Sequence, residues 1–333
     1  MNAYIKDIAY YLPQTEVTNE AIVRDFPEWS VEKIALKVGV NKRHVAAEDE
    51  TASDMAIKAA ERLFQNENIK KEDIDFVLFC TQSPDYKLPT SACIIQYQLG
   101  LRKDIGALDF NLGCSGYVYG LSLAKGLICG GIAQNVLLLT GETYSKHLHP
   151  RDKGNRTIFG DAASATLIST SGIAEIGNFS LGTDGSGVEN LIIKSGGMRC
   201  PEKQNDLCFD ENGNPISSDY LYMNGSEIFT FTLDNVPPLV ENTLLCNAVA
   251  KKDIDLFVFH QANKYMLDFL RKKIKIEPER FYYSLAEYGN TVSNTIPIAL
   301  ENAVEQGVVC AGKQILIAGF GVGYSWGGTV LTF

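Results

Sequence analysis

The sequence predicts an α/β fold in which strands alternate with helices and a mostly parallel sheet is covered on both faces. The first supporting observation is that short apolar runs alternate with segments whose apolar residues recur three or four positions apart. The second is an internal echo. KEDIDFVLFCTQ at 71–82 returns as KKDIDLFVFHQA at 251–262, and NVLLLTGE at 135–142 has a counterpart in QILIAGFG at 314–321. Two echoes in the same order indicate two duplicated halves. The alternative is that buried strands after Asp-Ile-Asp resemble one another by chance.

The first half, which we place at residues 1–171, supplies strands and helices in turn. A polar cap signal at 18–20 precedes a short helix, and the apolar residues of 51–64 recur at helical spacing. The expected strands are 4–11, 74–80, 107–110, 135–140 and 162–169, and the expected helices are 21–26, 29–37, 51–64, 90–99 and one that begins at 115.

The second half, residues 172–333, contains a polar stretch at 194–219 that is rich in Asn, Asp, Gly and Ser. This stretch predicts a long loop or cap over a cleft. A helix is expected over 225–250, and Pro237-Pro238 should break or kink it. The remaining expected elements are the strands 256–259 and 315–318 and the helix 293–305.

The composition narrows the class of protein. At 333 residues with 45% hydrophobic residues, the chain can bury a large core. It has no run of about eighteen apolar residues and no signal-peptide pattern at its start, so we expect a soluble, cytoplasmic protein. A formal net charge of -10 argues against nucleic acid or an anionic membrane as the main partner. The eight cysteines are scattered without disulfide or zinc spacing, so we expect reduced thiols and no metal.

One cysteine stands at a strand-to-helix junction. Cys114 follows the apolar run 107–110 and precedes the helical pattern that begins at Ser115. In that position the free amides and positive dipole end of a helix favour a thiolate, so we expect a lowered pKa and a nucleophilic sulfur. The alternative is a buried cysteine that packs as a small hydrophobe.

Three further features also lie at the ends of predicted buried elements. His260 follows the strand 256–259, the place where an open parallel sheet presents ligand-binding residues, although a structural histidine is the alternative. Asn290 lies in a Gly-Asn-Thr turn, which alone is ordinary turn chemistry. Val322 lies in the glycine-rich run GFGVGYSWGG, which can aim an amide at an oxyanion but lacks the context of a dinucleotide site.

Five motifs together resemble the β-ketoacyl-acyl carrier protein synthase III family of the thiolase superfamily. They are GCSGYVYGL around Cys114, HQAN from His260, GNTVSNTIP from Gly289, IFGDAASA from Ile158 and FGVGYSWG near the end. The resemblance implies a thiolase-like five-layered αβαβα fold and a homodimer. It also implies a decarboxylating Claisen condensation in fatty acid or specialised acyl-chain biosynthesis. The substrates would be acyl-CoA or acyl-acyl carrier protein and malonyl-acyl carrier protein, with no separate cofactor.

The resemblance assigns roles to particular residues. Cys114 would carry the acyl group, the amides of Cys114 and Val322 would hold the oxyanion, and His260 and Asn290 would donate hydrogen bonds to the malonyl thioester carbonyl. The substrate-binding positions implied are Lys37, Leu88, Lys153, Phe159, Gly225, Phe229 and Asn263. Lysines replace expected arginines at 37 and 153, and Leu88 replaces a pocket-closing aromatic residue contributed by the partner subunit. The lost arginines favour a carrier-bound or larger primer over acetyl-CoA, and the leucine is expected to reshape the pocket floor.

A basic helix after HQAN is the expected dock for an acidic carrier protein. It carries Lys264, Arg271, Lys272 and Lys273, and a solvated helix end is the alternative interpretation. Two other functions remain open. One is an acyltransferase or thioesterase that passes the acyl group from Cys114 to a non-malonyl acceptor, and the other is a non-catalytic partner subunit.

Overall fold

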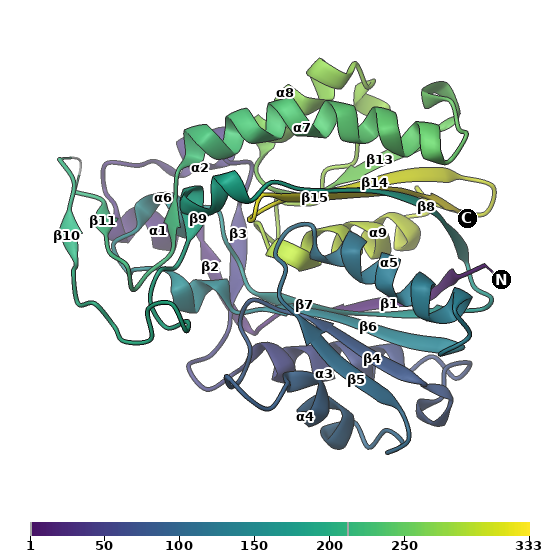
Figure 1. The fold of residues 1–333 in the computed structure, drawn as a ribbon. Coiled ribbons are helices and arrows are strands. Elements are labelled where there is room, and N and C mark those ends of the chain that lie inside the picture. The colour runs from purple at the N-terminus through teal and green to yellow at the C-terminus, as the bar shows by residue number, and fades with distance from the viewer. Residues whose placement is uncertain (1, 212) are drawn as a thin grey trace.

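The computed structural model describes residues 2–211 and 213–333 and contains a nine-stranded sheet that bends back over itself. Its strand order is β13-β14-β15-β8-β1-β7-β6-β4-β5. Figure 1 shows that the β13–β8 part lies above the β7–β5 part, with helices α5 and α9 between them. The first half supplies β1 (Tyr4–Tyr11), β4 (Phe76–Cys80), β5 (Gly106–Phe110), β6 (Asn135–Glu142) and β7 (Ala162–Ser169). The second half supplies β8 (Ala174–Thr183), β13 (Leu256–Phe259), β14 (Gln314–Gly321) and β15 (Ser325–Thr332).

Three pairs of long helices complete the five layers (Figure 1). They are α3 (Ala52–Leu63) with α4 (Ser91–Gln98) on one outside, α5 (Gly116–Cys129) with α9 (Thr295–Glu305) in the centre, and α7 (Gly225–Cys246) with α8 (Lys264–Ile274) on the other outside. Each sheet face packs on the adjacent layer because successive side chains of a strand point to opposite faces. In β4, for example, Phe79 packs toward α3 and Leu78 packs toward α5. The predicted αβαβα architecture is confirmed.

The predicted mostly parallel sheet is wrong, because the sheet is mixed. Only the pairs β4-β5, β4-β6 and β13-β14 are parallel, while β1-β7, β1-β8, β6-β7, β14-β15 and β15-β8 are antiparallel. Parallel neighbours need a crossover. Helix α4 lies between β4 and β5, α5 carries the chain from β5 to β6 on the other side of β4, and α8 and α9 lie between β13 and β14. The chain instead turns from β14 into β15 within residues 322–324, and so tight a turn forces an antiparallel pair.

The echoed segments take equivalent places, as the duplication predicts. In both halves the echoed strand runs parallel to its partner, Phe76 beside Val136 in one half and Leu256 beside Ile315 in the other. Both strands follow a short 3-10 turn, Lys71–Asp73 and Lys251–Asp253. In the second half, residues 281–283 run beside β13 where β5 runs beside β4, through a parallel bridge between Phe257 and Phe281. The boundary at 171/172 stays a prediction.

Helix α7 is not broken by its two prolines. Pro237 and Pro238 lie inside one continuous helix, which ends at Cys246 rather than near 250. Pro237 has no N–H to give to the carbonyl four residues earlier, that of Leu233. The Nζ atom of Lys273 in α8 donates to that carbonyl at 2.7 Å. The neighbouring helix therefore replaces one of the two hydrogen bonds that the prolines remove.

Smaller elements border the carboxyl ends of the strands. They are β2 (Thr15–Thr18), β3 (Lys42–Val45), α1 (Asn19–Asp25), α2 (Val31–Lys37), α6 (Lys153–Arg156), β9 (Leu191–Ile192), β10 (Cys208–Phe209), β11 (Pro215–Ile216) and β12 (Tyr222–Met223). The polar stretch 194–219 contains the small hairpin β10-β11. Among the described residues, no helix is both long and apolar enough to cross a bilayer.

Candidate active site

Cys114, His260 and Asn290 line one small cavity of about 170 Å³, although they lie far apart in sequence. Each follows the end of a strand or precedes a central helix, so the two halves place these side chains at a common edge. Of the predicted substrate-binding residues, Phe159, Gly225 and Asn263 line the same cavity. The wall is otherwise largely apolar, with side chains such as Ile228, Met266 and Phe320.

The sulfur of Cys114 faces two backbone amides. The residue lies between β5 and α5 and is 7% exposed. The N–H groups of Cys114 itself and of Val322 lie close enough to the sulfur to lower its pKa, and they are the pair expected at an oxyanion. Gly321 permits this approach, because a Cβ atom there would lie 2.8 Å from the Cβ and 2.9 Å from the Sγ of Cys114.

The predicted lowering of the Cys114 pKa is wrong. Burial raises the pKa of this thiol to about 12, and the nearby carboxyl group of Glu142 adds to the effect. The amides of Cys114 and Val322 act in the opposite direction but do not outweigh the loss of solvation. Cys114 is therefore a thiol at neutral pH, and its proton must leave during the reaction.

His260 is a buried neutral imidazole. The side chain is 2% exposed, and burial lowers its pKa to about 3. Its Nδ1 atom lies 2.7 Å from the hydroxyl of Thr295, while its ring packs edge-on against Phe320 at 5.7 Å between centroids. Because Nδ1 is held by Thr295, Nε2 is the ring nitrogen left for the cavity.

The side-chain amide of Asn290 is oriented by its own turn. Its Oδ1 atom accepts a hydrogen bond from the N–H of Val292 at 2.9 Å, so Nδ2 is free to donate into the cavity. Its backbone pairs with the Phe159 segment, donating to the carbonyl of Ile158 at 2.8 Å and accepting from the N–H of Gly160 at 3.1 Å. Asn290 is thus a fixed donor.

Two buried carboxyl groups were not predicted. Glu142 ends β6, is fully buried, and accepts hydrogen bonds from the N–H of Gln82 and the hydroxyls of Ser83 and Ser293. Burial raises its pKa well above the usual range. Asp161 accepts from the N–H groups of Ala46 and Ser145, and burial raises its pKa to about 6. The usable sequence signal was an acidic residue at the end of an apolar run.

Four predicted substrate-binding residues lie outside this cavity. Lys37 ends α2, Leu88 is 82% exposed, Lys153 begins α6 with an ion pair to Glu28, and Phe229 stacks on Tyr265. Their roles stay predictions.

The predicted docking residues lie on α8, and most are engaged by neighbouring groups. Lys264 pairs with Asp268 at 2.6 Å, Arg271 donates to the carbonyl of Ile276 at 3.0 Å, and Lys273 donates to that of Leu233. Lys272 is exposed.

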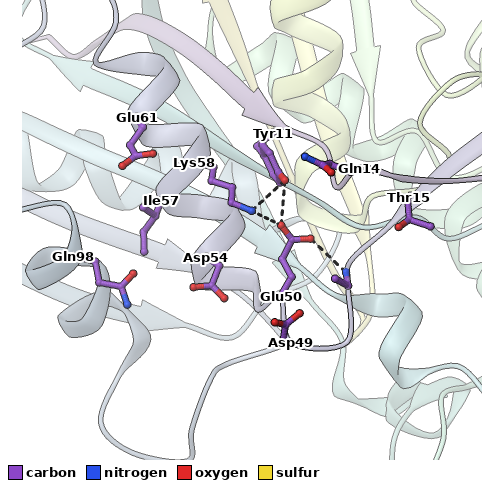
Figure 2. A pocket seen from close by; sticks show the side chains of 11 residues that line it. Tyr11, Gln14, Thr15, Asp49, Glu50, Asp54, Ile57, Lys58, Glu61 and Gln98 are labelled. Carbon is purple, nitrogen blue, oxygen red and sulfur yellow. Dashed lines mark hydrogen bonds and ion pairs between the residues drawn. The ribbon is translucent and has the colours of Figure 1, made fainter.

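A larger hollow elsewhere has a different character. Figure 2 shows this hollow, of about 600 Å³, in which Lys58 bonds both Tyr11 and Glu50. Its charged groups partly satisfy one another, and it contains none of the predicted site residues. Over residues 2–211 and 213–333, no cluster of three or more His, Cys, Asp or Glu side chains is arranged to hold a metal ion. Among the described residues, which include all eight cysteines, no disulfide is formed.

Comparisons with known proteins agree with the motifs. Residues 108–185 match the family 3-oxoacyl-[acyl-carrier-protein] synthase III, and residues 245–333 match the C-terminal part of that synthase. A β-ketoacyl-[acyl-carrier-protein] synthase III of Clostridium perfringens is 34% identical over 331 residues, which is 99% of each chain. The protein of that name from Fusobacterium nucleatum is 33% identical over 98% of this chain and 97% of its own.

Solved structures extend the likeness to three dimensions. A 3-oxoacyl-(acyl-carrier-protein) synthase III is 47% identical with a TM-score of 0.97, covering 100% of both chains. A 3-oxoacyl-(acyl-carrier protein) synthase from Burkholderia xenovorans is 37% identical with a TM-score of 0.90, covering 100% of this chain and 94% of its own. The chain therefore belongs to the β-ketoacyl-acyl carrier protein synthase III family and has its thiolase-like fold.

Proposed function

We propose that this protein condenses an acyl group, carried on Cys114, with malonyl-acyl carrier protein to give a β-ketoacyl product and carbon dioxide. The observation that carries the proposal is the shared cavity of Cys114, His260 and Asn290, in which the Asn290 amide is fixed as a donor. Simple acyl transfer to water or an alcohol has less need of that donor. The protein acts as an acyltransferase in the loading step, in which the acyl group moves to Cys114.

In the loading step the sulfur of Cys114 attacks the primer thioester. A sulfur–carbon bond forms, the bond to the donor sulfur breaks, and the thiol proton leaves with the departing thiol. The amides of Cys114 and Val322 stabilise the negative oxygen of the tetrahedral intermediate. Because the resting thiol has a raised pKa, Nε2 of neutral His260 is the candidate that accepts its proton during attack.

In the condensation step the malonyl carboxylate leaves as carbon dioxide, so no base is needed to make the carbanion. The electron pair delocalises onto the malonyl thioester oxygen as an enolate, which His260 and Asn290 stabilise by donating hydrogen bonds. The carbanion then attacks the acyl-Cys114 carbonyl, a carbon–carbon bond forms, and the carbon–sulfur bond breaks. The Cys114 sulfur leaves with the bonding pair and takes up one proton from solvent, which restores the thiol. A neutral histidine and an asparagine suit this role because each donates a hydrogen bond without surrendering its proton.

A second cavity, of about 660 Å³, is our candidate for the acyl chain. It lies beside Val322 and Gly323, and Leu191 lines both cavities. The predicted cap contributes to it through residues such as Ser195 and Asp219. We place Leu88 of a partner subunit at its open side.

The supporting feature for a homodimer is the sheet edge. Strand β5 ends the sheet order and exposes Leu108 at 38%, so a second copy could extend the sheet there. Lysine at positions 37 and 153 grips phosphate less well than arginine, so we favour a carrier-bound or larger primer. Carrier docking on α8 would depend most on Lys272, and we place the reaction in the cytoplasm.

Intact-mass spectrometry tests the proposal. The protein is incubated with a panel of acyl-CoA and acyl-carrier thioesters and then with malonyl-acyl carrier protein, with Cys114→Ala as control. We expect an acyl mass gain that is absent in the control and is discharged as a β-ketoacyl product with carbon dioxide. Discharge without carbon dioxide would instead establish acyl transfer or thioester hydrolysis, and absence of loading with every thioester would favour a non-catalytic subunit.

A further inference from the structure

The hydroxyl of Thr295 lies between two groups that compete for its single hydrogen atom. Its Oγ1 is 2.7 Å from Nδ1 of His260 and 3.1 Å from the carbonyl oxygen of Val292. Thr295 is 3% exposed and His260 is 2% exposed, so water does not substitute for these contacts. The backbone of Val292 also acts to raise the pKa of His260, as a carbonyl acceptor near the ring does. All three residues belong to one buried network.

The direction of the hydroxyl fixes the tautomer of His260. If Thr295 donates to the carbonyl of Val292, its oxygen accepts from Nδ1–H, and Nε2 presents a lone pair. If Thr295 donates to Nδ1, the ring proton must be on Nε2, which then presents a donor. A carbonyl oxygen can only accept, so the carbonyl of Val292 alone would hold the ring in its Nδ1–H form.

The backbone of Val292 supports both members of the catalytic pair. Its φ of 58° lies in the left-handed region, which is unfavourable for a β-branched residue. In this conformation its N–H donates to Oδ1 of Asn290, while its carbonyl accepts from Thr295. Strain at one residue therefore accompanies the orientation of both Asn290 and His260.

The two half-reactions require different protonation states of Nε2. Loading requires a lone pair that takes the Cys114 thiol proton, whereas condensation requires an N–H that donates to the malonyl thioester oxygen. We propose that Thr295 is a positioning residue whose rotating hydroxyl accommodates both tautomers of His260, so that Nε2 serves as acceptor in loading and as donor in condensation. This inference rests on the proposed function. The tautomers interconvert when the ring transiently leaves this network and exchanges protons with solvent: Nδ1 loses one proton and Nε2 gains one.

The test compares Thr295→Val with Thr295→Ser. The valine variant retains the shape but leaves the carbonyl of Val292 as the remaining acceptor near the ring, which favours the Nδ1–H form. Loading should therefore stay within about threefold of wild type, while carbon dioxide release from malonyl-acyl carrier protein falls about 100-fold. The serine variant should restore release. Nitrogen-15 NMR of the four histidines, assigned with His260→Ala, should show the Nδ1–H tautomer alone in Thr295→Val and a larger Nε2–H fraction in wild type and Thr295→Ser.

Three outcomes would contradict the proposed role of Thr295. They are equal losses of loading and release in Thr295→Val, unchanged release, or the same His260 tautomer in all three proteins. Thermal unfolding and the alkylation rate of Cys114 identify a variant whose site is disordered, and the NMR comparison of Thr295→Ser with wild type then still decides. If wild type itself releases no carbon dioxide, the proposed function fails instead, and this outcome is separate from that of the variants.

Discussion

The carboxyl ends of β4 and β13 occupy the same place in the two halves but differ in chemistry. The hydrogen bonds just before these two strands are alike. Asp75 accepts from the N–H of Asn135 at 3.0 Å, and Asp255 accepts from that of Gln314 at 2.8 Å, so each carboxylate ties its strand to the next. One position beyond each strand's shared Phe, the first half has Cys80 where the second half has His260.

The environments of Cys80 and His260 explain the difference. Cys80 is fully buried, donates to the carbonyl of Leu112, and lies so close to Gly116 that a Cβ atom there would be 2.3 Å from its sulfur. His260 instead lines the cavity with Cys114. The residues that precede the two central helices differ similarly, with Cys114 before α5 and Asn290 before α9. The duplication supplied equivalent positions, and local packing decided which of them reach the cavity.

The largest expected effect separates the two cysteines. Cys114→Ala should abolish acyl loading, because the sulfur that forms the thioester is removed. Cys80→Ala should retain loading and lower the free energy of unfolding by about 1 kcal/mol, the typical result of removing one buried atom. Intact-mass spectrometry and denaturant unfolding of both variants measure these effects. Loss of loading in a folded Cys80→Ala protein would give Cys80 a chemical role and end the contrast.

The pH dependence of Cys114 alkylation sharpens the same contrast. With the thiol pKa raised to about 12, the thiolate fraction rises tenfold per pH unit below that value. The iodoacetamide rate at Cys114 should therefore rise about 1,000-fold from pH 6 to pH 9 without a plateau. Peptide mass spectrometry follows this site separately from the exposed cysteines, with glutathione as the reference thiol. A plateau below pH 8 would show that the helix start and amides outweigh burial.

The cysteine variants and the pH dependence of Cys114 alkylation show which features could be predicted from the sequence. The strand over Tyr4–Tyr11 and the helix Ala52–Leu63 follow directly from apolar periodicity. The sign of the Cys114 pKa shift does not, because Cys114 is buried against Gly321 of the other half, about two hundred positions away. Continuity of α7 was equally hidden, since the donor that replaces the proline N–H belongs to Lys273 on another helix. Sequence located the reactive side chains, and tertiary packing determined their state.

The next largest effect is expected at Asn290, the hydrogen-bond donor that the second half contributes to the cavity. Asn290→Ala should lower carbon dioxide release from malonyl-acyl carrier protein about 100-fold, as expected for loss of one oxyanion donor. Acyl loading should change little, because the amides of Cys114 and Val322 lie elsewhere. Single-turnover mass spectrometry measures both steps. If loading and release fall together in a folded variant, Asn290 shapes the cavity rather than stabilising the enolate.

Strands β6 and β14 are equivalent in the two halves and end in Glu142 and Gly321. Substitution of Glu142 should have the smallest effect on activity and the clearest effect on stability. Glu142→Leu removes the acceptor for Gln82, Ser83 and Ser293, so the free energy of unfolding should fall by about 2–4 kcal/mol. Glu142→Gln retains an acceptor and should match wild type at low pH.

The pH dependence of stability in wild type and in Glu142→Gln distinguishes charge from hydrogen bonding at Glu142. A carboxyl group whose folded pKa lies well above its ordinary 4.5 keeps its proton in the native state, so its stabilisation is complete below 4.5 and is lost as pH rises toward the folded value. Glu142→Gln does not titrate, so its stability should gain on that of wild type as pH rises from 5 to 8. Denaturant unfolding at several pH values measures the gap. A constant gap would mean that Glu142 is already ionised in the folded protein, and the first half would then hold a permanent negative charge near Cys114.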